Sequence, residues 1–231
     1  VLAVPHAYVR NQGDAWTWAL NQANRAFHAT ASREASAEAR GDDIRDYHAL
    51  AATTGLPCRH VPIIFEGGAV DTDGTGLFVT TEQCLLNPNR NPTLDRRQIE
   101  TLLAGALGLS SMLWLGDGLV NDHTDGHVDN LARMVAPGIL AVPQASTPDD
   151  PNTAIYEDAA ARARAFGLEV ARLPSVGRYE IDGVIVPASY MNFCITNGAV
   201  IVPQYGAPND AAALDALASF FPGRALVGLP S

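Results

Sequence analysis

The sequence is poor in the features that mark disulfide-stapled, membrane-spanning or nucleic-acid-binding proteins. Its 231 residues include three cysteines, Cys58, Cys84 and Cys194, whose wide spacing excludes a dense disulfide framework. No apolar run approaches the roughly 18 residues that a membrane span needs. Lys and Arg number 15 against 25 Asp and Glu, and the net charge of −10 disfavours binding to nucleic acid or anionic membrane. We therefore expect a soluble cytoplasmic protein with no membrane contact, for which a cationic ligand would be favourable.

What is present is the composition of an ordinary folded protein. Hydrophobic residues make up 47% and charged residues 17%. Strand-like apolar runs alternate with helical patterns, which predicts an α/β or α+β domain. The pattern predicts a hairpin over Ala69–Thr81 and a helix that Thr93 caps and Gly108 ends. It also predicts helices over Asp42–Thr53, Asn152–Phe166 and Asp210–Phe220, and strands over Leu113–Leu115, Arg133–Val135, Ile139–Val142, Met191–Thr196, Val200–Val202 and Ala225–Leu229.

An internal repeat suggests a circular arrangement. Gly138-Ile-Leu-Ala-Val-Pro143 and Gly198-Ala-Val-Ile-Val-Pro203 each place Gly and Pro five residues apart around an apolar strand. The spacing of about sixty residues predicts strand-strand-helix-strand modules, although two hairpins could share this turn pattern by chance. The opening Val1-Leu-Ala-Val-Pro5 resembles the same unit and Ala225–Leu229 resembles the start of another, so we expect the chain to begin and end inside modules.

The densest polar segment, Asn121–Asn130, contains a histidine and a carboxylate two residues apart. On the extended backbone expected there, His127 and Asp129 would project from one face while Val128 packs behind them. Such a pair can act as a general acid/base and hold a cation. Three other interpretations remain: a metal site formed by His123 and His127, acidic turn formers, or a solvated loop.

A second candidate is Glu66-Gly67-Gly68, which follows an apolar run. Two carboxylates on different strands can hold a planar guanidinium by paired hydrogen bonds, although Glu66 alone is more often a turn residue. Cys84 and Cys194 are interpreted as inert core cysteines. The segment Asn87–Pro92 is interpreted as a rigid turn rather than a binding loop.

Several of these segments together resemble one family. The motifs are Glu66-Gly-Gly-Ala-Val-Asp71, Thr80-Thr-Glu-Gln-Cys-Leu-Leu-Asn-Pro-Asn-Arg-Asn-Pro92, Gly126-His-Val-Asp-Asn130, Ala188-Ser-Tyr-Met-Asn-Phe193, Asn197-Gly-Ala-Val-Ile-Val-Pro203 and Phe221-Pro-Gly-Arg224. In their order and spacing, from about residue 41 onward, they resemble the motifs of the agmatine deiminase and bacterial peptidylarginine deiminase family.

The resemblance implies a pentein α/β propeller of five modules, with about three and a half to four of them in one partial catalytic domain over residues 1–231. It implies hydrolysis of a guanidinium group, most readily that of agmatine, through a cysteine thiouronium intermediate and with no metal or other cofactor. His127, Asp129 and Glu66 would be catalytic, and Asp129, Glu66, Asp125 and Asn130 would bind substrate. The family's nucleophilic cysteine is expected beyond Ser231.

Three further possibilities stay open from the resemblance. The chain could be a catalytically inactive remnant that at most binds guanidinium ligands, or its substrate could be peptidylarginine instead of agmatine. The protein could also form a homo-oligomer, because an incomplete ring of modules leaves strand edges unpaired.

Overall fold

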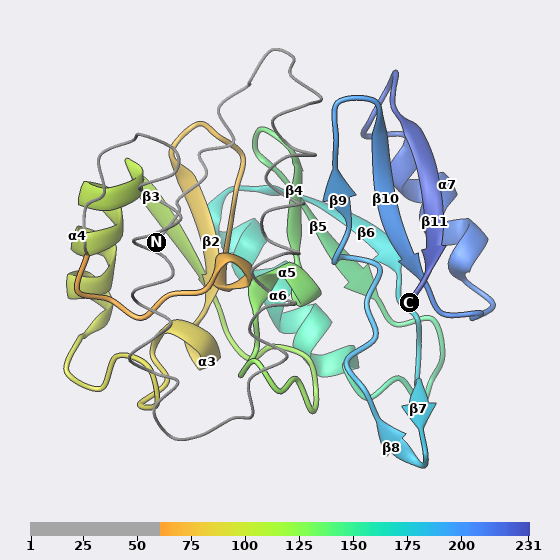
Figure 1. Cartoon of the computed structure of the whole chain (residues 1–231), viewed down its shortest axis with the longest axis horizontal. Coiled ribbons are helices and arrows are strands. Elements are labelled where there is room, and N and C mark those ends of the chain that lie inside the picture. The colour runs from red at the N-terminus through yellow and green to blue at the C-terminus, as the bar shows by residue number, and fades with distance from the viewer. Residues whose placement is uncertain (1–60) are drawn as a thin grey trace, which may run out of the picture. The chain divides into compact units, whose positions relative to one another are not determined.

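The computed structural model describes residues 61–231, and the residues from Ile63 onward form one compact unit (Figure 1). The helix predicted over Asp42–Thr53, the repeat-like segment Val1–Pro5 and Cys58 lie outside the described residues. The single domain predicted over residues 1–231 therefore stays a prediction. No helix in the described part of the chain is long and apolar enough to cross a membrane.

Three modules of the same topology follow one another along the described chain. In each, two strands pair antiparallel, and a helix then leads to a third strand that runs parallel to the second. The first contains β1 (Val70–Thr72), β2 (Leu77–Thr81), α4 (Arg96–Leu107) and β3 (Ser111–Leu115), the second β4 (Arg133–Ala136), β5 (Ile139–Gln144), α6 (Thr153–Phe166) and β6 (Glu169–Pro174), and the third β9 (Cys194–Ile195), β10 (Ala199–Gln204), α7 (Asp210–Ala218) and β11 (Ala225–Pro230).

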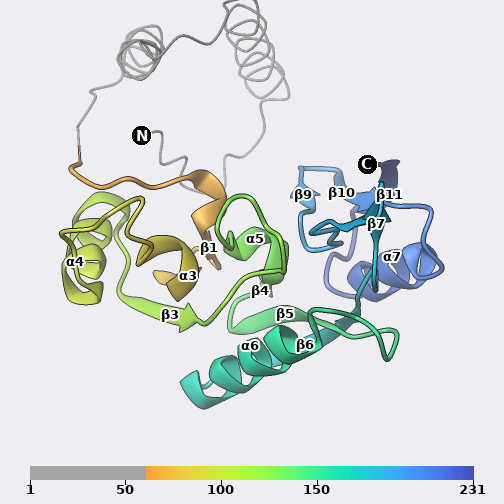
Figure 2. The ribbon, with the colours of Figure 1, turned by 90° about the horizontal axis from the view of Figure 1, so that it is seen from below.

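The repeated topology confirms a mixed α/β fold and gives the sequence repeat its meaning. Gly138 to Pro143 and Gly198 to Pro203 hold the two central strands β5 and β10, each of which pairs with both neighbours in its sheet. The helices α4, α6 and α7 lie on the outside of this unit, whereas the short helix α5 (Val128–Leu131) lies on the inner side (Figure 2). Closure into a ring of five modules stays a prediction.

Helix α4 shows how local sequence fixes an element. It begins after Asp95 rather than Thr93, because the Asp95 carboxylate accepts a hydrogen bond from the Gln98 backbone at 2.8 Å. The Gln98 side chain accepts one from the Asp95 backbone in return, completing a capping box. At the other end Gly108 takes the left-handed conformation with φ 76° and closes the helix as predicted.

The strand predicted over Met191–Thr196 is largely wrong, since only Cys194–Ile195 form β9. The carbonyl oxygens of Met191 and Phe193 both accept hydrogen bonds from Nη1 of Arg133, at 3.2 and 2.9 Å. Backbone groups bound to a side chain from another module are not available for a β ladder, so pairing starts only after them. Helix α7 also ends earlier than predicted, at Ala218 rather than Phe220.

Several elements were not predicted, and all except β6 are short. They are the 3-10 helix η1 (Gly67–Ala69), α3 (Glu82–Leu85), α5, β6, β7 (Glu180–Ile181) and β8 (Val184–Ile185). The three short helices matter most for function, because they lie where polar motifs enter or leave strands: η1 precedes β1, α3 follows β2, and α5 precedes β4.

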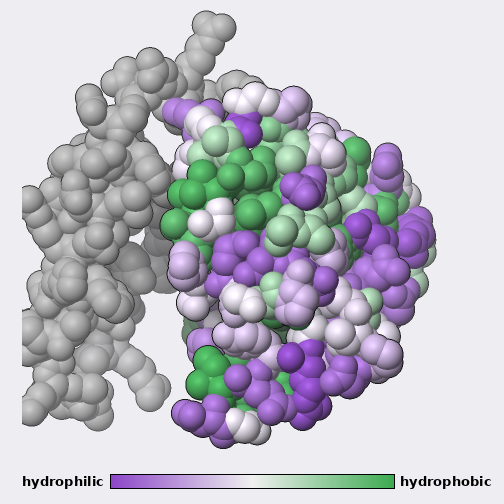
Figure 3. Space-filling view, turned by 90° about the vertical axis from the view of Figure 1, so that its right-hand side faces the viewer, coloured by the Kyte–Doolittle hydropathy of each residue, from purple (hydrophilic) through white to green (hydrophobic). Residues whose placement is uncertain are grey.

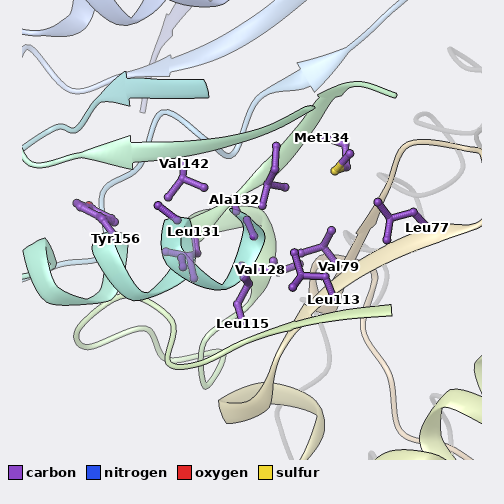
Figure 4. Packing of buried hydrophobic residues seen from close by; sticks show 14 of the residues in the cluster. Leu77, Val79, Leu113, Leu115, Val128, Leu131, Ala132, Met134, Val142 and Tyr156 are labelled. Atoms are coloured by element: carbon purple, nitrogen blue, oxygen red, sulfur yellow. The ribbon is translucent and has the colours of Figure 1, made fainter. Parts of the chain in front are cut away.

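Neighbouring modules share two hydrophobic cores, and the first module has a further core of its own. Val79 and Leu113 of the first module and Val142 of the second belong to one core, in which Val128 and Leu131 of α5 lie between them (Figure 4). A second core joins β5 and β6 to β10 and α7 in the same way. The modules therefore support one another, and the segment that carries α5 is fixed between the first two.

Candidate active site

The candidate site lies on three short segments of the chain, each of which begins or ends at a buried residue. Glu66 precedes η1, Cys84 lies in α3, and His127 precedes α5. Val128 of α5 is fully buried and anchors that segment in the core. The Thr81 hydroxyl joins two of the segments, because it caps α3 and donates a hydrogen bond to the Gly126 carbonyl oxygen at 2.5 Å.

The extended backbone predicted for His127 and Asp129 is wrong from Val128 onward, where α5 begins, yet the two side chains still meet. His127 is the N-cap residue of α5, and Asp129 lies in its first turn. Both reach over Gly68: a Cβ atom on that glycine would collide with Nδ1 of His127 and would lie 2.7 Å from Oδ2 of Asp129. Helix α5 can place these two side chains beside each other because Gly68 has no side chain that would occupy the same space.

Glu66 completes the group that the structure brings together. Its Oε2 lies 3.8 Å from Nε2 of His127, and its side chain is 40% exposed against 14% for the imidazole. Nε2 of His127 and Oδ1 of Asp129 are buried and have no hydrogen-bond partner within residues 61–231. Burial raises the pKa of the Asp129 carboxyl, with the charges of His127 and Arg133 acting in the opposite direction. The Asp129 oxygen is therefore an unsatisfied acceptor for a cationic donor, and the imidazole lies beside it.

Arg90 is a site residue that the sequence interpretation missed. Its side chain is 8% exposed. Nε donates to both oxygens of Glu66 at 2.9 and 3.0 Å, Nη1 to Asp125 at 3.0 Å, and Nη2 to the Thr124 carbonyl at 2.6 Å. The segment Asn87–Pro92 turns as predicted, but it also delivers this arginine. In the sequence, the feature that could have indicated this residue is a single arginine among asparagine and proline residues.

The side chains of Asp125 and Asn130, which were predicted to bind substrate, form hydrogen bonds with other side chains of the protein. Oδ2 of Asp125 accepts hydrogen bonds from Asn89 at 2.7 Å and from Arg90 at 3.0 Å. The hydrogen bond from Asn89 lowers the pKa of this carboxyl, burial opposes it, and the hydrogen bond from Arg90 adds to the lowering. The Asn130 amide donates to Asp122 at 3.3 Å and accepts from Asn192 at 2.9 Å. These contacts hold the loop that carries His127.

The two described cysteines differ from each other. Cys84 is buried as predicted, but it also adjoins the site, since one ligand atom from each of Glu66, Cys84 and His127 lies within 4.8 Å of the others. Burial raises the pKa of its thiol to about 12, and the Arg90 charge only partly opposes this. Cys194 is exposed on β9, so its interpretation as a core cysteine is wrong. His123 is exposed and does not belong to this group.

Known proteins resemble this chain along most of its length. The agmatine deiminase of Pseudomonas fluorescens (strain SBW25) is 38% identical over 191 residues, which cover 72% of this chain and 52% of the relative. A structure of the agmatine deiminase of Enterococcus faecalis, described as catalysing its reaction, matches 79% of this chain and 57% of its own with a TM-score of 0.73 and 35% identity. A C. jejuni agmatine deiminase with substrate bound matches with a TM-score of 0.76, 29% identity, and coverage of 82% of this chain and 57% of its own.

The chain spans about half the length of the curated relatives it matches. The family described as Porphyromonas-type peptidyl-arginine deiminase matches residues 7–231, a longer stretch than the motifs from residue 41 onward had indicated. This match covers nearly the whole sequence, and the solved agmatine deiminases described above have a similar fold. The chain therefore belongs to the Porphyromonas-type peptidyl-arginine deiminase family.

Proposed function

We propose that this protein hydrolyses the guanidinium group of agmatine, releasing ammonia and N-carbamoylputrescine. The observation that carries the proposal is the buried pair of unsatisfied atoms, Nε2 of His127 and Oδ1 of Asp129, beside the Glu66 carboxylate. A guanidinium is a flat cation with several N–H donors, and it can satisfy two carboxylates at once. The agmatine deiminases among the relatives support the choice of substrate.

Each side chain has a distinct role in the proposed reaction. Asp129 and Glu66 accept hydrogen bonds from the guanidinium nitrogens and orient its carbon for attack. His127 donates a proton to the departing ammonia and then takes one from the attacking water. The proposed reaction has a covalent intermediate. A thiolate adds to the guanidinium carbon and ammonia leaves; water then adds to the same carbon and displaces the thiolate, which releases the ureido product.

Neither described cysteine is assigned as the nucleophile. Burial raises the pKa of Cys84 to about 12, so its thiolate would be scarce at neutral pH. Cys194 lies on β9 and outside the group around His127. We assign the covalent step to a cysteine outside residues 61–231. The same observation favours a second candidate function, in which this chain binds guanidinium ligands without turnover.

Calorimetry and an ammonia assay test the proposal together. Agmatine should bind the chain, whereas putrescine, which has an amine in place of the guanidinium, should bind at least about tenfold more weakly. Ammonia release from agmatine would support the enzyme, and binding without release would support the second candidate. A peptide with an internal arginine, measured in parallel, separates the two substrate classes. Equal affinity for agmatine and putrescine would contradict a guanidinium site.

A further inference from the structure

A second kind of ligand fits the same cluster of side chains. Glu66, Cys84 and His127 come from three separate segments, and one ligand atom of each lies within 4.8 Å of the other two. A carboxylate, a thiol and an imidazole are the three side-chain types that bind zinc in proteins. Three protein ligands with a fourth position left open is the usual arrangement of an accessible zinc centre.

We propose that Glu66, Cys84 and His127 form a zinc-binding site whose occupation excludes a guanidinium ligand. Ligand atoms around tetrahedral zinc lie roughly 3.3–3.7 Å apart, given metal–ligand bonds of about 2.0–2.3 Å. The separation of 3.8 Å between His127 and Glu66 is already close to this. Since all three ligand atoms lie within 4.8 Å of one another, no separation has to shrink by more than roughly 1.5 Å, and rotation of the partly exposed Glu66 side chain can supply part of this.

The unsatisfied state of the imidazole supports the site independently of the residue types. Nε2 of His127 is buried and has no hydrogen-bond partner within the described chain. A buried polar atom without a partner is costly, so a metal that accepts its lone pair would relieve that cost. Glu66 can contribute one oxygen, since its other oxygen can keep the 2.9 Å hydrogen bond from Nε of Arg90.

Two features of the surroundings oppose the metal and limit its affinity. The thiol of Cys84 must release its proton to solvent as the zinc–sulfur bond forms, and burial makes that release unfavourable. The Arg90 guanidinium repels a divalent cation, whereas Glu66, Asp125 and Asp122 attract one. No electron transfer is involved, because zinc does not change its oxidation state. The site is accordingly one that fills and empties with free zinc rather than a permanent structural centre.

Titration of the untagged, chelator-treated chain tests the proposal. Zinc should bind with one equivalent, and cobalt used in its place should give the near-ultraviolet absorption of a thiolate–metal bond. Cys84→Ala should remove this absorption and weaken zinc binding at least about tenfold. Cys194→Ala and Cys58→Ala, which remove the other two thiols, are the matched controls and should change neither. A wild-type chain without the thiolate band, or unchanged zinc affinity in Cys84→Ala, would overturn the site.

A second variant tests the site even if Cys84→Ala, which changes a buried residue, does not fold. Glu66→Gln changes a side chain that is 40% exposed and should also weaken zinc at least about tenfold. Unchanged zinc binding by this variant, with the thiolate band retained at full strength, would remove Glu66 from the site and contradict the proposal. Circular dichroism of each variant verifies that it is folded.

The competition between zinc and agmatine rests on the proposed function, because it requires both ligands to use Glu66 and His127. Added zinc should weaken agmatine binding in proportion to site occupation, and a chelator should restore it. Simultaneous binding of the two at full affinity would overturn the shared site. Agmatine that fails to bind the metal-free chain would count against the proposed function alone, since the cobalt spectrum still reports on the metal.

Discussion

At the scale of single residues, the site is built from charges that are not fully compensated. Asp129 is the clearest case, since one carboxylate oxygen is buried without a partner among residues 61–231 and burial raises the pKa of the group. Function and stability therefore make opposite demands on this residue. A carboxylate that must receive a cation is costly to keep in the ligand-free protein.

We predict that Asp129→Asn stabilises the chain at neutral pH by about 1 kcal/mol while weakening agmatine binding at least about tenfold. The amide carries no charge to desolvate, but it cannot pair with a guanidinium cation. Thermal unfolding and calorimetry measure the two effects. Asn130→Asp, one residue along the same helix, adds a charge instead of removing one and is a control that should not stabilise. Equal melting temperatures of wild type and Asp129→Asn would contradict the account.

The pH dependence of the stability difference has a definite sign. The folded-state pKa of Asp129 lies above the unfolded value near 3.8, so the folded protein holds this proton more tightly. The group therefore favours folding below the unfolded pKa, and that contribution is lost as pH rises through the folded pKa. The advantage of Asp129→Asn should accordingly grow from about pH 4 upward. An advantage that shrinks with rising pH would be inconsistent with a raised pKa.

Arg90 should act through geometry and not through charge alone. Arg90→Lys keeps the charge but loses the planar fork that reaches Glu66, Asp125 and the Thr124 carbonyl, so we expect a loss of about 1–3 kcal/mol in unfolding free energy. Urea denaturation measures this. Arg178→Lys, which alters an exposed pair with Glu180, is the control and should cost under about 0.5 kcal/mol. Similar losses in both variants would argue against a special role for Arg90.

At the scale of elements, short helices place the site side chains. The 3-10 helix η1 passes so close to α5 that Gly68 has no room for a side chain, whereas a Cβ on its neighbour Gly67 would meet nothing within 4 Å. The adjacent glycines thus have different roles. One permits the close approach of two elements, and the other lies at the exposed surface of η1.

We predict that Gly68→Ala weakens agmatine binding roughly tenfold or more, because the new methyl group displaces His127 and Asp129. Gly67→Ala should leave binding unchanged and is the matched control within the same short helix. Calorimetry on both variants makes the comparison. Binding that is unaffected in Gly68→Ala, or lost equally in both, would show that the approach of η1 to α5 does not position the site.

At the scale of the whole described unit, the third module has exposed apolar side chains. Val227 and Leu229 of β11 are 38% and 49% exposed, and within residues 61–231 this strand pairs only with β10. Apolar surface is visible on this side of the molecule (Figure 3). An apolar strand with an unpaired edge is a surface on which a second strand can add.

We predict that the chain self-associates at concentrations of tens of micromolar, on the order expected for a weak contact, and that Val227→Lys with Leu229→Lys makes it monomeric. Sedimentation velocity measures the mass. Ile181→Lys with Val184→Lys on the β7–β8 hairpin removes a comparable exposed pair and should leave association unchanged. A wild-type chain that is monomeric throughout this range would contradict the prediction.

The sequence by itself determined the α/β class, the repeat that holds β5 and β10, and the candidates Glu66, His127 and Asp129, because periodicity and motif spacing are local properties. It missed Arg90 and the proximity of Cys84, and it missed the short helix that contains Asp129. Those features depend on contacts between segments tens of residues apart, such as the 24 residues between Glu66 and Arg90. Only tertiary packing decides which side chains face one another, because one core shared by two modules fixes where each loop ends.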